Sequence, residues 1–335
     1  MSSAGVPDPL RREVTGPKVV AFGGGHGLAA TLRSLRHITQ RLTAVVTVAD
    51  DGGSSGRIRQ ETPVLPPGDL RMALVALCDD SDWGLAWRDL MQLRFETNGS
   101  LNQHALGNLL ILGLWQMYED PIVGLDAVGR LLNTHGRVLP MSLEPLRIEA
   151  DIVLDGGEEI KIDGQTSVAT AGGAIRDLRV EPSDAPVPAA ALEAIEEADW
   201  VVLGPGSWYT SVIPHLMVDE LRRALVTTEA HRALVLNLTV QDEETFQMSS
   251  GDLVRAIQDA APDLKIDVVI ADPTSVDDID DLLEASAELG ARVLLRQVHS
   301  GAEDATHDPL RLAAALRDAF ERYLGEVGDS EQWLS

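Results

Sequence analysis

The sequence predicts an α/β fold: a doubly wound, mostly parallel Rossmann-like sheet with helices on both faces and a small β-rich insertion. Three observations predict it. Short apolar runs alternate with amphipathic stretches of helical period along most of the chain. Glycine-rich or acidic segments directly follow several of these runs. Between about residues 138 and 182 the hydrophobic period becomes two, as in antiparallel strands. Strands separated by helices form parallel sheets with right-handed crossovers.

The first strand is predicted at residues 18–22, where Lys18 precedes an apolar run. Gly23-Gly24-Gly25-His26-Gly27 follows, and a helix is predicted from Leu28 to about His37. A glycine-rich turn before a helix presents backbone N–H groups and the positive helix end to an anion. The absence of a following Gly-Lys-Ser/Thr excludes a Walker A loop. Residues 25–30 instead fit the dinucleotide fingerprint, with alanine in the last place.

The second predicted strand, Ala44–Ala49, ends in Asp50-Asp51-Gly52-Gly53-Ser54-Ser55-Gly56-Arg57. Glycines let the backbone approach a ligand, the serines supply hydroxyl groups, and the two aspartates can hold a metal ion or a ribose. A sharp turn with Asx-type hydrogen bonds is the alternative, because most Asp-Gly pairs form one. The density of small and polar residues favours a ligand site.

A third strand, Trp200–Leu203, is followed at once by Gly204-Pro205-Gly206-Ser207 and then Trp208-Tyr209-Thr210-Ser211. The hydroxyl residues of this segment are also good helix caps, which is the alternative interpretation. Small or acidic residues thus follow three predicted strands. Since the carboxyl ends of parallel strands meet at one sheet edge, we predict one ligand that spans them.

The remaining elements follow from periodicity. Helices are predicted at residues 69–78, 83–94, 104–118 and 122–133. Two period-two runs at 147–154 and 159–163, joined by a turn at 155–157, predict an antiparallel hairpin beside the main sheet. After residue 188 we predict helix 189–197, strand 199–203, helices near 210–227, strand 233–238, helix 250–260, strand 266–271, helix 277–289, strand 292–298 and helix 309–324.

Domain organisation and location follow from composition. We predict a disordered tail at residues 1–16, a single α/β domain at 17–324 and a flexible tail at 325–335. The N-terminal segment is polar and lacks the apolar stretch of a signal peptide. No apolar segment approaches the ~20 residues that span a bilayer. We therefore expect a cytoplasmic protein without membrane insertion.

A net charge of −26 excludes function classes that depend on clustered cations. Sequence-independent nucleic-acid binding and binding to anionic membranes are among them. Cys78 is the only cysteine, so a disulfide framework and a thiolate metal site are also excluded. Because Cys78 lies in an apolar run, we expect a buried structural thiol.

Several polar and aromatic residues have two interpretations. His104 begins a strongly apolar helix and is either a packed or capping residue or a ligand contact. Asn237-Leu238-Thr239 follows a strand, so its side chains can read a base or ribose, or cap a helix. Trp83, Trp87 and Trp115 lie at helical spacing among leucines and are expected in the core. The acidic run 277–281 is expected to be a solvated helix N-terminus.

Taken together, these segments resemble the YvcK-type gluconeogenesis factors, a family related to the phospholactate transferases of CofD-like fold. The matching segments are Gly23–Gly27, Asp50–Arg57, Pro67–Arg71, His104–Leu109, Gly204–Ser207, Tyr209–Ser211, Asn237–Thr239 with Gln241 and Glu244-Thr245, and His307–Pro309. They extend over nearly the whole folded chain, and the double-aspartate loop separates this branch from the transferases. The resemblance implies the fold predicted above.

Strand ends and resemblance together predict a nucleotide site. Its predicted residues are Gly23, Gly24, Gly25, His26, Gly27, Asp50, Asp51, Gly52, Gly53, Ser54, Ser55, Arg57, His104, Asn108, Gly204, Gly206, Ser207, Tyr209, Thr210, Ser211, Asn237, Thr239, His307 and Asp308. We expect a diphosphate over the first and third loops, with Asn237 and Thr239 near the nucleoside.

A magnesium ion is predicted at Asp51 and Asp69, with Asp50 as a third ligand. Mg²⁺ prefers few carboxylates together with phosphate oxygens and water. The matching aspartates of the transferase relatives imply the same role. Asp69 has an alternative role as the cap of helix 70–78.

One position departs from the family. Many relatives carry an arginine just before the His-Asp pair, whereas this chain has Thr306. If that arginine pairs with ligand phosphates, another bidentate donor must replace it. Arg57, Arg59 and Arg296 are the candidates.

Three functions are consistent with the sequence. The resemblance implies a sensor that binds a UDP-sugar such as UDP-N-acetylglucosamine, needed for cell shape and peptidoglycan synthesis during growth on gluconeogenic carbon sources. It would act through a protein partner, and we expect a homo-oligomer. The first alternative is a Mg-dependent transferase acting on a nucleotide-activated substrate. The second is an oxidoreductase that uses NAD(P), which is disfavoured because no hydride-transfer constellation is evident. We assign no catalytic residue.

Overall fold

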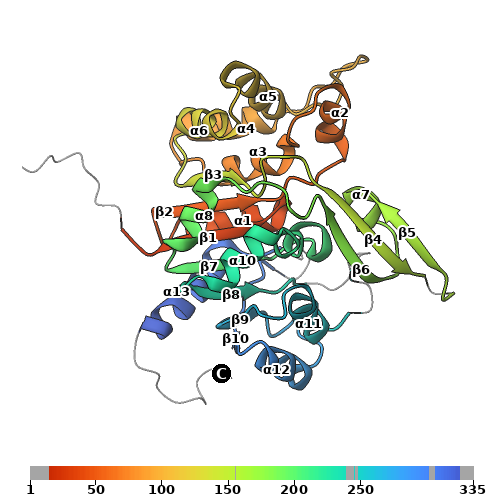
Figure 1. Ribbon diagram of the computed structural model, residues 1–335. Helices are drawn as coiled ribbons and strands as arrows, with labels where there is room; N and C mark the ends of the chain where they lie inside the picture. Colours follow the sequence, from red (N-terminus) through yellow and green to blue (C-terminus); the bar gives the residue numbers. More distant parts are fainter. Residues whose placement is uncertain (1–14, 155, 239–244, 246–247, 302–305, 325–335) are drawn as a thin grey trace, which may run out of the picture.

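The computed structural model describes residues 15–154, 156–238, 245, 248–301 and 306–324. Within them the main sheet is parallel and has the strand order β10-β9-β8-β7-β1-β2-β3 (Figure 1). Its strands are β1 (Lys18–Gly23), β2 (Arg41–Val46), β3 (Arg137–Pro140), β7 (Trp200–Leu203), β8 (His231–Val235), β9 (Val268–Ala271) and β10 (Arg292–Leu295). This order confirms the predicted doubly wound sheet.

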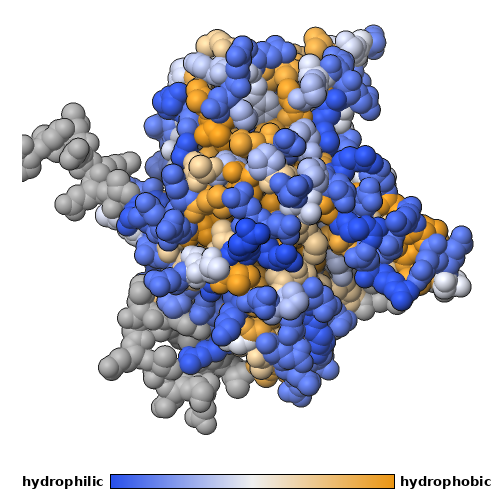
Figure 2. Space-filling view, in the orientation of Figure 1, coloured by the Kyte–Doolittle hydropathy of each residue, from blue (hydrophilic) through white to orange (hydrophobic). Residues whose placement is uncertain are grey.

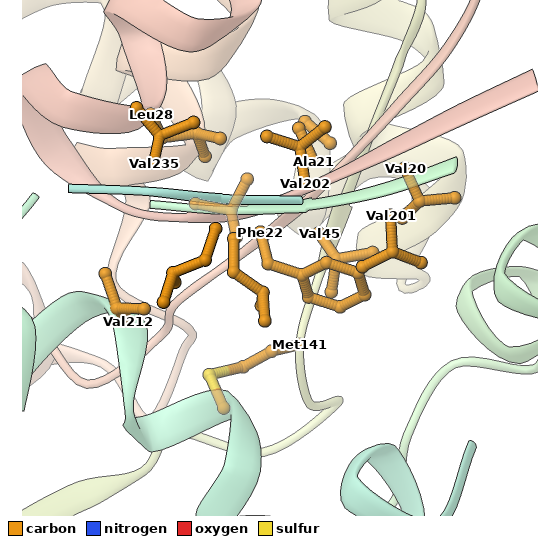
Figure 3. Close-up of a cluster of buried hydrophobic side chains, with 14 of the residues drawn as sticks. Val20, Ala21, Phe22, Leu28, Val45, Met141, Val201, Val202, Val212 and Val235 are labelled. Atoms are coloured by element: carbon orange, nitrogen blue, oxygen red, sulfur yellow. The ribbon is translucent and has the colours of Figure 1, made fainter. Parts of the chain in front are cut away.

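The central strands are buried on both faces, which is why they read as continuous apolar runs rather than as alternating ones. Ala21 of β1 pairs with Ala44 of β2 on one side and Val202 of β7 on the other, and all three are fully buried. Figure 3 shows Leu28 packed on one side of these strands and Met141 on the other. The core therefore runs through the sheet and fixes the strand ends that carry the candidate site.

Helices cover both faces of the sheet (Figure 1). Their bounds are α1 (Gly25–Leu35), α2 (Gly53–Glu61), α3 (Pro67–Ala76), α4 (Asp82–Gln92), α5 (Leu106–Tyr118), α6 (Pro121–Leu132), α8 (Ala189–Glu196), the π-helix η1 (Trp208–Val212), α9 (Pro214–Met217), α10 (Asp219–Thr227), α11 (Ser250–Ala260), α12 (Ile279–Glu288) and α13 (Pro309–Leu324). Helix α1 packs against α3 and α13, whereas α8 packs against α10. Hydrophilic residues dominate the face in Figure 2, consistent with the net charge of −26.

The β-rich insertion is a separate antiparallel sheet of order β5-β4-β6, with the short helix α7 (Gln165–Ala169) beside it. Its strands are β4 (Arg147–Val153), β5 (Glu159–Asp163) and β6 (Ala174–Glu181). The predicted hairpin is confirmed as β4 and β5, and β6 adds a third strand. The predicted start at residue 138 was wrong, because the buried run of β3 pairs with β2 in the main sheet.

Two further predictions needed correction. Helix α2 begins at Gly53, within the segment expected to be a loop, and its sparse apolar residues gave no helical period. Trp83 is not a core residue: its side chain is 56% exposed, and its indole N–H donates to the carbonyl of Leu131. Trp115 is buried as expected, and so is Cys78. The predicted tails lie largely outside the described residues, and none of the described helices is long and apolar enough to cross a membrane.

Candidate nucleotide-binding site

The winding direction of the sheet reverses between β1 and its neighbour β7. After β1 the chain continues toward β2 and β3, and after β7 it continues toward β8. The loops that leave the two strands therefore diverge, which is where doubly wound folds bind ligands. A cavity of about 450 Å³ opens at this point. It is lined by Gly24, Gly25, His26, Gly27, Pro205, Gly206, Ser207, Ser211, Asn237, Leu238 and His307.

The glycines after β1 serve different purposes. Gly25 has a φ of +56°, a left-handed conformation that suits glycine, and a Cβ built there would meet no atom within 4 Å. A Cβ on Gly27 would lie 2.2 Å from the carbonyl oxygen of Pro205. Gly25 therefore leaves space beside the first turn of α1, and Gly27 lets the β7 loop approach it.

The first turn of α1 supplies hydrogen-bond donors. The first N–H groups of a helix have no intrahelical acceptor. Gly25 donates its N–H to Asp69, and Leu28 donates to the carbonyl of Gly24. The N–H groups of His26 and Gly27 remain beside the cavity at the positive end of the helix dipole.

The loop after β7 is held by side chains of two other elements. The Asn237 amide makes a reciprocal pair with the backbone of Gly206: it accepts from the N–H at 2.9 Å and donates to the carbonyl at 2.9 Å. Thr31 of α1 donates its hydroxyl to the carbonyl of Gly204 at 3.1 Å. Asn237 thus has a structural partner where the sequence suggested a contact with base or ribose. Thr239, its predicted companion, lies outside the described residues.

Residues 207–212 do not form the capped helix that was the alternative interpretation. Ser207 makes no side-chain cap, and Trp208–Val212 form a π-helix, a conformation often found at functional sites. Ser211 lies beside the backbone of Gly24, where an added Cβ would be 3.2 Å from its hydroxyl oxygen. Thr210 is buried, and the Tyr209 hydroxyl contacts the sulfur of Met248 at 3.6 Å, so neither lines the cavity.

The two predicted residues of the His-Asp pair have separate roles. His307 lines the cavity, and burial lowers its pKa to about 4, against the effect of its hydrogen bond to the Leu236 carbonyl. Its imidazole is therefore neutral at physiological pH. Asp308 caps α13 by accepting from the N–H groups of Leu310 and Arg311 at 2.9 and 2.8 Å. Asp308 is thus placed as a structural cap.

The two loop aspartates point in different directions. Asp50 accepts a hydrogen bond from the N–H of Gly52 at 2.9 Å, which is the Asx-type turn considered above. Asp51 accepts from both the N–H and the hydroxyl of Thr166, at 3.0 and 2.8 Å. Thr166 belongs to α7, so Asp51 caps a helix of the insertion and ties it to the main domain.

Asp69 lies in the first turn of α3, is half-buried, and has its Oδ2 2.6 Å from the position of a Cβ built on Gly24. Burial raises its pKa to about 7, the nearby Asp50 carboxylate adds to the shift, and the Gly25 N–H opposes it. The alternative that Asp69 caps a helix was wrong, because α3 begins at Pro67 and Pro66 stands at the capping position.

These positions bear on the predicted magnesium ion. In the described part of the chain, no three His, Cys, Asp or Glu side chains are grouped to hold a metal. Asp50, rather than Asp51, interacts electrostatically with Asp69. The carboxylates of Asp50 and Asp69, together with the phosphate oxygens of a bound nucleotide, would match the donor set that Mg²⁺ prefers. Asp50 and Asp69 are therefore the residues that fit such an ion best.

His104 and Ser54 form a buried pair that resembles a base and nucleophile, with a distance of 3.0 Å between Nδ1 and Oγ. Arg57 donates its Nε–H to Nε2 of His104 at 3.2 Å, so the ring proton must lie on Nδ1 and point at Ser54. Asn108 donates to the same Ser54 oxygen at 3.0 Å. Because His104 is a donor here, it cannot activate Ser54, and the cluster instead connects α2 to α5.

Ser55 has a similar structural role, since its hydroxyl accepts from the N–H of Gly68 at 3.0 Å and fixes the start of α3.

Three arginines were considered as replacements for the arginine that many relatives carry at the position of Thr306, and all three form hydrogen bonds away from the cavity. Arg59 donates to the Asp50 carbonyl, and Arg296 donates to Asp318. Arg57 donates to His104, and none of the three arginines is among the described residues that line the cavity.

Comparison with known proteins agrees with this architecture. The family model described as 2-phospho-L-lactate transferase CofD matches residues 19–320. The chain belongs to the CofD family. A gluconeogenesis-factor protein of Mycobacterium tuberculosis is 46% identical over 321 residues, which cover 93% of this chain and 92% of that protein. The gluconeogenesis factor of Bacillus subtilis is 31% identical over 319 residues, covering 91% and 98%.

A crystal structure of a CofD-family relative shows the same fold. Protein BH3568 from Bacillus halodurans superposes with a TM-score of 0.80 at 32% sequence identity, covering 90% of this chain and all of that one. The predicted fold and the predicted resemblance to gluconeogenesis factors are thereby confirmed. The chain is similar to these proteins over nearly its whole length.

Proposed function

We propose that this CofD-family protein binds a UDP-activated sugar of the UDP-N-acetylglucosamine type and acts as a regulatory sensor rather than as an enzyme. One observation carries the proposal: in the described part of the chain, the cavity at the β1–β7 switch point is lined by glycines, hydroxyl and amide groups, and no Asp, Glu, Lys or Arg is among these lining residues. In a chain with a net charge of −26, such a lining leaves backbone N–H groups and hydroxyls facing an anion, and Asp69, which accepts from the Gly25 N–H, is not among the lining residues.

The diphosphate would lie over the first turn of α1. His26 and Gly27 line this space in the first turn of α1 and would offer their N–H groups, and Ser207 and Ser211 would add hydroxyl donors from the β7 side. Leu238 and His307 line another part of the cavity and offer an apolar surface and a neutral imidazole to the nucleoside or the sugar. Mg²⁺, if bound, would neutralise phosphate charge beside Asp50 and Asp69.

A sensor requires two conformations with different affinities for the ligand. The loop that precedes α2 is tied to the insertion through Asp51 and Thr166. Gln165 of α7 also donates to the carbonyl of Thr210 in η1 at 3.4 Å. Ligand contacts with either loop would therefore change the position of α7, which a protein partner in cell-wall synthesis could recognise. The names of the relatives support a role during gluconeogenic growth.

Thermal unfolding across a ligand panel tests the binding step. The panel contains UDP-N-acetylglucosamine, UDP-glucose, GDP-mannose and NAD, each with and without Mg²⁺. A ligand at 100 times its dissociation constant adds about 2.7 kcal/mol to the free energy of unfolding. We expect the two UDP-sugars to stabilise the protein. Stabilisation by NAD or GDP-mannose alone would contradict the proposed ligand.

A transferase is the second candidate because of one residue. Asp69 accepts from the N–H of Gly25, and its pKa of about 7 suits a general acid or base. That role requires an acceptor substrate beside the nucleotide. Turnover of the bound nucleotide, tested below, distinguishes the two candidates.

A further inference from the structure

Arg71 of α3 is a buried cation that forms no ion pair with any carboxylate of the described residues. Its side chain belongs to a residue only 6% exposed, and its Nε–H donates to the Asn108 amide oxygen at 2.9 Å. Within the described residues, its two terminal nitrogens make no hydrogen bond and no carboxylate lies within 4.0 Å of the guanidinium. These nitrogens are nevertheless not among the polar atoms sealed from solvent. A buried charge without a partner is costly, so such a group is normally balanced by an anion.

The neighbouring charges do not provide that balance. Asp69 and Asp50 attract Arg71 only at longer range. Burial lowers the pKa of Arg71, and the like charge of Arg94 lowers it further. Among the described residues, no carboxylate therefore forms a direct ion pair with Arg71.

The arginine is also held in place. A Cβ added to Gly107 would lie 2.8 Å from Cδ of Arg71, which shows how closely α5 packs on the side-chain stem. Asn108, which orients the guanidinium, is fixed in turn by Ser54. A guanidinium locked by packing and by one neutral hydrogen bond, with its terminal donors free, is preorganised for a planar oxyanion.

We propose that Arg71 binds the carboxylate or phosphate of an acidic small molecule, at a site separate from the glycine-rich segment Gly23–Gly27. Arg71 is absent from the described lining of the β1–β7 cavity, and Asp69, which accepts from the Gly25 N–H, interacts with Arg71 only through longer-range electrostatics. The site does not depend on the nucleotide proposal. It belongs either to a second acidic ligand or to a distal acid group on the nucleotide ligand itself.

Arg71→Met tests the site, with Arg232→Met as the matched control. Arg232 is a half-buried arginine whose guanidinium donates to the backbone carbonyls of Leu225, Val226 and Thr228. Arg232→Met should lose stability, since it leaves these carbonyls unpaired. Arg71→Met should lose much less stability without added anion, because it removes a buried charge that has no direct ion pair and leaves only the Asn108 amide oxygen without its donor.

Titration with inorganic phosphate and with malonate, at constant ionic strength set with chloride, supplies the second readout. We expect a saturable rise in the wild-type Tm with one of the two. Arg71→Met should weaken this binding at least about tenfold, since a charge-assisted bidentate contact is lost. Comparison of UDP-glucuronate with UDP-glucose then distinguishes the sources: a preference for the glucuronate that disappears in Arg71→Met places the acid on the nucleotide ligand.

Two results would overturn the inference. One is a wild type that responds to none of the acidic probes. The other is an Arg71→Met variant that loses as much stability as Arg232→Met and keeps its anion response, which would make Arg71 a purely structural residue.

Discussion

Residue identities in the candidate site were more predictable than residue partners. The glycines at 25 and 27 were identified from their position after a strand, and the cavity confirms that they lie together. The sequence did not show that Gly27 faces the Pro205 carbonyl, or that Asn237 holds Gly206. Such contacts join segments far apart in the chain, and periodicity carries no information about them. For the same reason, Thr31 and Thr166 were missed although both fix site loops.

Substitution of Gly25 tests the proposal that the diphosphate lies over the first turn of α1. Asn and Asp both tolerate its left-handed backbone better than other side chains do, and the space beside it is open. Gly25→Asn and Gly25→Asp should therefore both fold. We expect Asp to weaken UDP-sugar binding at least about tenfold more than Asn, because it places a carboxylate beside the diphosphate. Calorimetric titration of the pair checks this, and equal affinities would move the phosphates away from α1.

Asp69 should make stability depend on pH in an unusual direction. The unfolded carboxyl loses its proton near the ordinary value of 3.8, whereas the folded one keeps it up to a pKa of about 7. The folded state thus binds an extra proton between these values, and its stability falls as the pH rises through this window. In Asp69→Asn this slope, at most about 1.4 kcal/mol per pH unit, should disappear. Urea unfolding in the presence of EDTA measures it.

Asp272 serves as the comparison for Asp69, because its pKa is shifted in the opposite direction. It is buried, which raises its pKa, but hydrogen bonds from Thr274, Val298 and His299 outweigh burial and lower it overall. Its contribution to stability is therefore present above the ordinary aspartate range and lost as the pH falls through the folded pKa. An Asp69→Asn protein with an unchanged pH profile would show that the Asp69 carboxyl ionises normally.

At the scale of elements, the sequence predicted the strongly periodic segments and missed the weakly periodic ones. Helix α11 was predicted from its periodicity with the bounds that the structure shows, and a capping box at Ser249 begins it. Helix α2 was missed, since it contains glycine and serine and begins at a glycine with a φ of +48°. Its formation depends on tertiary bonds such as that between Ser55 and Gly68.

The contact between Asp51 and α7 should control the mobility of the insertion. Loss of a helix cap costs about 1 kcal/mol, which is a roughly fivefold increase in local opening. We expect Asp51→Ala and Thr166→Val both to accelerate amide exchange in residues 165–169. Asp278→Ala removes the cap of the distant α12 and serves as the control, since it should leave this segment unchanged. Exchange that is equally fast in all three variants would mean that Asp51 does not hold α7.

The whole molecule explains why the cavity lies where it does. In this strand order only the β1–β7 boundary has crossovers that run in opposite directions, and the alternation of strands and helices was sufficient to predict one such sheet. It was not sufficient to predict which loops meet. The Asp50 loop follows β2 rather than β1 or β7, so its residues lie beside the cavity loops without lining the cavity itself.

Turnover distinguishes the sensor from the transferase. Transfer requires a base aimed at an acceptor. Among the described residues, no carboxylate lies within 4.0 Å of His26, His104 or His307 to orient it as a base, and His104 donates a hydrogen bond to Ser54. We therefore expect the purified protein to bind UDP-N-acetylglucosamine stoichiometrically and release it unchanged after incubation with Mg²⁺ and cell extract. Mass spectrometry of the nucleotides measures this. If UMP or UDP forms with the wild type and not with Asp69→Asn, Asp69 supports catalysis and the protein is a transferase.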